Sequence, residues 1–189
     1  MNEGARQRAG SSIVAKEVRM VETLRRMYRY QDWAMEQVWP GLDGLTAEEL
    51  DAPGCSGNGT IRGTLTHLIR VQNGWFSWFD GTMSAADAQS MRRKDPDFTS
   101  MADARAAWRE ASDRAQACVA KASDADVAKV WTHTMGNGTT LAQPLGEMML
   151  HVANHGTHTR AQIAAALRRL GKDPGVLEYL KFAIMFPAA

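Results

Sequence analysis

The sequence predicts an all-α protein: a four-helix bundle with short extra helical segments. Apolar residues recur at three- and four-residue steps in four long stretches, which is the spacing of a helix with one buried face. Residues that favour helix starts and ends flank most of these stretches, and runs of β-branched residues are nearly absent. Four long helices without a clear strand pattern favour a bundle.

The first stretch covers residues 13–39, where the apolar positions fall largely on one side of a helix. Pro40 follows it and is expected to end or interrupt the helix, because proline lacks the backbone N–H that an interior position needs. Residues 46–49 read Thr-Ala-Glu-Glu, the pattern of a capping box, and predict a short helical turn.

Residues 52–59 contain three glycines and a proline and are expected to form a loop. Thr60 is well placed to cap a second helix, which Asp80 and the glycine after it would close. Thr99 or Ser100 can cap a third helix that runs to about residue 119.

The last third of the chain predicts a short extended piece and a turn within residues 130–138. The fourth helix is expected to begin near Pro144, since proline is tolerated in a first turn, and to stop at Gly171. Residues 176–185 are expected to form a short helical tail.

Length and composition fit one domain, expected over residues 13–189, preceded by a polar disordered leader of residues 1–12. The net charge is +1 with no basic stripe, so a nucleic-acid partner is not expected. No apolar run reaches the roughly 18–20 residues of a membrane span. The two cysteines, Cys55 and Cys118, form no CxxC pair, so a reducing cytoplasm is the expected location.

Three of the five histidines lie close together in the predicted fourth helix. His151, His155, His158 and Gln162 fall within roughly a 60° arc of one helix face. Two imidazoles four residues apart can bind one metal ion from a single helix. The alternative is a solvated polar face that binds nothing.

A third ligand must come from another helix, and His67 lies mid-way along the predicted second helix with its side chain facing inward. Three histidines and a water would leave an open coordination position, as in catalytic sites. The alternative for His67 alone is a core histidine satisfied by a hydrogen bond.

Residues 151–163, HVANHGTHTRAQI, resemble the signature of the DinB/YfiT-like family of metalloenzymes. Further matches are residues 30–34, YQDWA, and residues 64–68, TLTHL, with Trp75 after them. The resemblance extends from about residue 20 to 182. It implies a four-helix bundle with unusual connections, which is often a homodimer.

The resemblance also implies a metal held by one ligand from the second helix and two from the last long helix. In this chain those residues are His67, His151 and His155. Many relatives carry histidine where this chain has Thr159, so a pair of His155 with His158 remains the alternative.

The leading functional hypothesis is a metal-dependent enzyme, a hydrolase or thiol-dependent transferase with a small-molecule substrate. The resemblance implies a divalent ion, Zn²⁺ or Ni²⁺, and a low-molecular-weight thiol. Glu147 and His158 are the nearby candidates for a general base. Arg160 and Gln162 can contact substrate or hold the helix packing, and packing is favoured. The rival hypotheses are a stress-associated protein with a structural ion and a purely structural or interaction module.

Overall fold

The computed structural model describes residues 19–56, 58–84, 86, 87, 90, 98, 100–134 and 138–187. The predicted four-helix bundle is confirmed, and its long helices are α1 (Met20–Asp43), α3 (Ile61–Phe79), α5 (Met101–Lys121) and α7 (Leu145–Arg169). The shorter elements are α2 (Ala47–Asp51), α6 (Asp124–Ala128), β1 (Val130–Thr134), β2 (Thr140–Pro144) and α8 (Tyr179–Met185). The expected leader, residues 1–12, lies outside the described residues.

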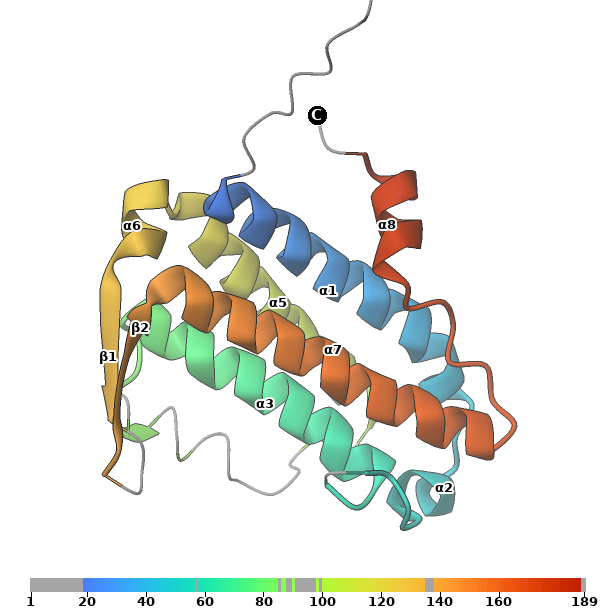
Figure 1. Cartoon of the computed structure of the whole chain (residues 1–189). Coiled ribbons are helices and arrows are strands. Elements are labelled where there is room, and N and C mark those ends of the chain that lie inside the picture. The colour runs from blue at the N-terminus through green and yellow to red at the C-terminus, as the bar shows by residue number, and fades with distance from the viewer. Residues whose placement is uncertain are drawn as a thin grey trace, which may run out of the picture.

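The four long helices form a bundle in which α1 packs against α5 and α7 rather than against α3, the next long helix along the chain. Helix α7 packs against both α1 and α3, and α5 packs against the same two helices from behind (Figure 1). Helices α1 and α3 therefore lie on a diagonal of the bundle. This arrangement places α3 and α7 side by side over much of their length.

Side-chain caps define the starts of the second and third long helices where the sequence predicts them. The Thr60 hydroxyl accepts from the Gly63 N–H at 3.0 Å and starts α3. Ser100 starts α5 through a capping box with Asp103. Local hydrogen bonding satisfies the first backbone donors of each helix and so fixes its start.

Helix α1 begins at Met20, after Arg19, which has extended backbone angles. The predicted helical residues 13–18 lie outside the described residues. Contrary to the prediction, the helix continues through Pro40 to Asp43. Proline removes only its own N–H bond, and packing of the buried Trp39 and Leu42 holds this last turn in the core.

Residues 130–134 of the predicted extended piece form β1, one strand of an antiparallel ladder whose second strand, β2, the sequence does not predict. Thr132 pairs with Ala142 at the centre of the ladder. Trp131 of β1 packs on Trp78 and Phe79 of α3, with ring centroids 3.8 and 4.8 Å apart. Aromatic contact with α3 therefore attaches this hairpin to the bundle.

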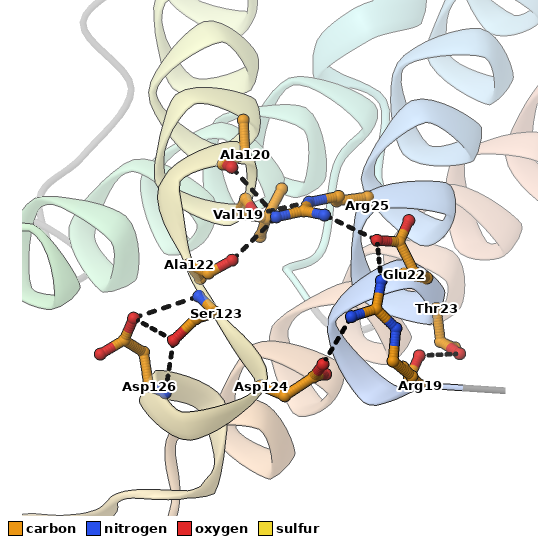
Figure 2. Close-up of polar contacts among 10 residues, drawn as sticks. All are labelled: Arg19, Glu22, Thr23, Arg25, Val119, Ala120, Ala122, Ser123, Asp124 and Asp126. Atoms are coloured by element: carbon orange, nitrogen blue, oxygen red, sulfur yellow. Dashed lines mark hydrogen bonds and ion pairs between the residues drawn. The ribbon is translucent and has the colours of Figure 1, made fainter. Parts of the chain in front are cut away.

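Arg25 ties the start of α1 to the end of α5 (Figure 2). Its guanidinium donates to the carbonyls of Val119, Ala120 and Ala122 at 3.1, 3.1 and 2.8 Å. These carbonyls lack helical partners, and the guanidinium satisfies them by hydrogen bonds. Its positive charge also interacts favourably with the negative end of the α5 helix dipole. Glu22 in turn accepts from Arg25 at 2.7 Å.

The core has a large apolar cluster in each half of the bundle. One is built around Trp39 and Trp108 and the other around Phe76 and Met149. A smaller cluster, in which Phe182 is buried, attaches α8 to α1. Among the helices described, none is both long and apolar enough to cross a membrane.

Candidate metal centre

The packing of α3 against α7 brings two of the three predicted ligands together. The Nε2 atoms of His67 and His155 lie 3.1 Å apart, and the ring centroids are 5.0 Å apart. Both side chains are half-buried between the two helices. The contact joins residues 88 positions apart in the chain, so only the tertiary fold creates it.

The electrostatics of this pair favour neutral imidazoles, the form that binds a metal ion. Burial, together with the smaller effects of the neighbouring His67, His151 and His158, lowers the pKa of His155 to about 4. Burial also lowers the pKa of His67. Both rings therefore carry a lone pair at neutral pH.

The spacing of the two nitrogens fits a shared ion. Two nitrogens bound to a tetrahedral Zn²⁺ at about 2.0–2.1 Å from the ion lie about 3.3 Å from each other. The observed separation of the Nε2 atoms is 3.1 Å. A small opening of the pair would admit the ion, so His67 and His155 fit the predicted metal.

His151 lies one turn before His155 on α7, but its side chain is not part of the His67–His155 contact. It is exposed, and its ring meets the edge of Trp75 with 6.1 Å between centroids. Across the described part of the chain, no three histidine, cysteine, aspartate or glutamate side chains converge closely enough to hold a metal ion. The described structure therefore brings together two of the three predicted ligands, and the role of His151 stays a prediction.

The remaining predicted site residues occupy different surroundings. His158 is exposed, and its Nε2 lies 2.9 Å from Gln162 Nε2. Glu147 is exposed near the start of α7. Arg160 is buried, with 1% of its surface accessible, and donates to Gln31 Oε1 and to Thr157 Oγ1. This burial agrees with a role in helix packing, which the sequence analysis favours over contact with substrate.

Sequence reasoning missed Gln31, which connects α1 to the helix that carries the histidines. Its Nε2 donates to the Ala153 carbonyl at 2.6 Å, and its Oε1 accepts from Arg160. Gly156 permits this approach, because a Cβ at that position would lie 2.5 Å from Gln31 Oε1. The available signal was a glutamine on the apolar stripe of α1, in register with Tyr28 and Met35.

The metal-free protein is expected to lose stability as the pH falls from 6.5 towards 4. The pKa of His155 is about 4 in the folded chain and 6.5 without the fold, so between these values the unfolded chain binds the additional proton. Stability from this group is therefore complete above pH 6.5 and is lost as the pH falls to 4. After allowance for the solvent-exposed part of the ring, the expected loss is about 1–2 kcal/mol.

Urea unfolding with a chelator present, at pH 7 and pH 4.5, would measure this loss. His155→Gln is the control, since its side chain does not titrate in this range, and it should reduce the pH dependence. An equal loss of stability in the wild-type protein and the variant would contradict the assignment to His155.

Comparisons with known proteins agree with this architecture. A solved structure described as "YfiT from Bacillus subtilis is a probable metal-dependent hydrolase with an unusual four-helix bundle topology" matches with a TM-score of 0.55. The two chains are 19% identical, and the match covers 80% of this chain and 86% of that one. No curated protein sequence matches. The model of the DinB family matches residues 20–186, and the chain is therefore a member of the DinB family.

Proposed function

We propose that this chain is a metal-dependent enzyme, a hydrolase or thiol-dependent transferase, whose divalent ion is held by His67, His151 and His155. The observation that carries the proposal is the 3.1 Å approach of the His67 and His155 Nε2 atoms across two helices. His151 completes the set once its ring turns from Trp75 towards His155, since residues four apart share a helix face.

A catalytic role is favoured over a structural one because the bundle has another source of stability. Two large apolar clusters hold the long helices together without any contribution from the histidines. The pair itself is only half-buried, and His151 beside it is exposed, so a substrate can approach. An ion that only tied α3 to α7 would add little to this packing.

A divalent ion in this position, Zn²⁺ or Ni²⁺, would lower the pKa of a coordinated water or thiol and polarise a substrate oxygen. The chain supplies the geometry: α3 and α7 carry the imidazoles, and the Trp75 ring lies against His151. Glu147 and His158 on the exposed face of α7 are the proposed proton carriers. The description of the YfiT structure supports hydrolysis. The resemblance to the DinB/YfiT-like family supports a low-molecular-weight thiol as co-substrate.

Reconstitution followed by chelation tests the proposal. Purified protein dialysed against Zn²⁺ or Ni²⁺ is expected to retain about one ion per chain by elemental analysis. Removal of the ion is expected to leave the helical circular dichroism unchanged and to lower the melting temperature by a few degrees. A bundle that unfolds on chelation would support the structural role. Protein that holds no ion after reconstitution would refute the metal site.

We propose further that the protein acts as a homodimer in the cytoplasm. Support for the dimer comes from α8, which exposes Leu180, Ile184 and Met185 at 69%, 72% and 54% of their surface. Apolar side chains gathered on one helix are typical of an interface. Size-exclusion chromatography with light scattering would test the dimer.

A further inference from the structure

A groove of about 470 Å³ lies along α7, between α1 and α8. Its walls are largely apolar: Met27 and Tyr30 come from α1, Leu150 from α7 and Tyr179 from α8. Polar groups enter it from α7 through Glu147, His151, Asn154 and Thr157. An apolar hollow with a few polar groups at fixed points is the usual form of a small-molecule site.

Two guanidinium groups donate hydrogen bonds to residues that line this groove. Arg26 Nε donates to the Tyr179 hydroxyl at 3.2 Å, and Arg160 Nη2 donates to Thr157 Oγ1 at 3.4 Å. Arg160 is buried, and its guanidinium also lies 5.6 Å from the Tyr30 ring. Within the described residues, neither arginine forms an ion pair with a carboxylate. The positive charges beside Tyr179 and Thr157 therefore have no carboxylate partner in the part of the chain that the structure describes.

The charges favour an anion at one place in the groove. Tyr179 accepts from Arg26 through its oxygen, so its own hydroxyl proton can be donated to a ligand. Asn154, which is exposed, adds an amide donor to the lining. Glu147 also lines the groove, ten residues before Thr157 on α7, which is about 15 Å along the helix. A negative group is favoured beside Tyr179 and disfavoured beside Glu147.

We propose that this groove binds a small organic anion with an apolar body. The anionic group lies near Tyr179 and Asn154, and the apolar body lies along Met27 and Leu150 towards His151. Because His151 also belongs to the proposed metal centre, the groove's role as the substrate site rests on the proposed function. Binding in the groove itself requires no metal.

Four probes that share one apolar body separate the contributions: 3-phenylpropionate, 3-phenylpropyl phosphate, 3-phenylpropanol and 3-phenylpropylamine. Isothermal titration calorimetry is carried out on metal-free and on reconstituted protein. The two anions are expected to bind at least about tenfold more tightly than the alcohol, and the amine more weakly still. The tighter of the two anions identifies carboxylate or phosphate as the preferred group.

Arg26→Gln and Tyr179→Phe are each expected to weaken anion binding about three- to five-fold and to leave alcohol binding unchanged. Arg29→Gln is the matched control, because Arg29 is an exposed arginine of the same helix, whereas Arg26 is the one that bonds to the groove-lining Tyr179. Equal binding of amine and anion, or equal effects of Arg26→Gln and Arg29→Gln, would overturn the inference.

The metal and the groove can fail separately. Anion binding to metal-free protein that retains no ion after reconstitution would support the groove and refute the metal centre. Protein that binds the ion but none of the four probes would refute the groove alone.

Discussion

Replacement of His67 by alanine is expected to lower the affinity for Zn²⁺ or Ni²⁺ by about 100-fold or more. His67 is the only predicted ligand on α3, so its loss leaves α7 alone to hold the ion. Loss of a group that merely orients a ligand already costs 10–100-fold in affinity, and removal of a ligand costs more. Competition with a chromogenic chelator would give the affinity, and elemental analysis would give the occupancy.

His158→Ala is the matched control, because His158 is exposed on the same face of α7 and lies beside Gln162 rather than His67. It is expected to leave the affinity unchanged, whereas His151→Ala should weaken it. The reverse pattern would assign the third ligand to His158. Full metal loading in a folded His67→Ala variant would refute the site that spans the two helices.

Gln31→Leu is expected to lower the free energy of unfolding by about 3 kcal/mol or more. The substitution removes the acceptor for the buried Arg160 guanidinium and the donor to the Ala153 carbonyl. Burial already lowers the pKa of Arg160 to about 10, which shows the cost of holding this charge inside the protein. A buried charge that loses its hydrogen-bond acceptor costs several kcal/mol. Urea denaturation followed by circular dichroism would measure the loss.

The double variant Gln31→Leu with Arg160→Met tests the cause. Removal of the charge together with its acceptor is expected to cost less than the sum of the single losses, with a coupling of about 1–3 kcal/mol. Gln116→Leu is the control, since it removes one half-buried hydrogen bond, to Ser112, and should cost about 1 kcal/mol or less. Strict additivity of the two single losses would contradict a coupled pair.

The amino-acid sequence determined the long helices and the histidine face of α7. Thr60 and Ser100 start their helices through hydrogen bonds to residues three positions on, which any chain with those residues can form locally. His151, His155 and His158 share a helix face because the helical repeat alone places them there. The prediction that His67 and His155 share an ion rested on the inward position of His67, on the histidine face of the last long helix and on the family resemblance.

The tertiary structure decided the features that depend on neighbours distant in the chain. Core packing keeps α1 helical beyond Pro40. Aromatic contact with α3 attaches the β1–β2 hairpin, whose second strand the sequence does not predict, to the bundle. The orientation of His151 towards Trp75 likewise depends on where α3 lies. The burial of Arg160 depends on Gln31, which is 129 residues away in the chain. Helical periodicity acts over a few residues, whereas these contacts form only when the packed bundle brings distant segments together.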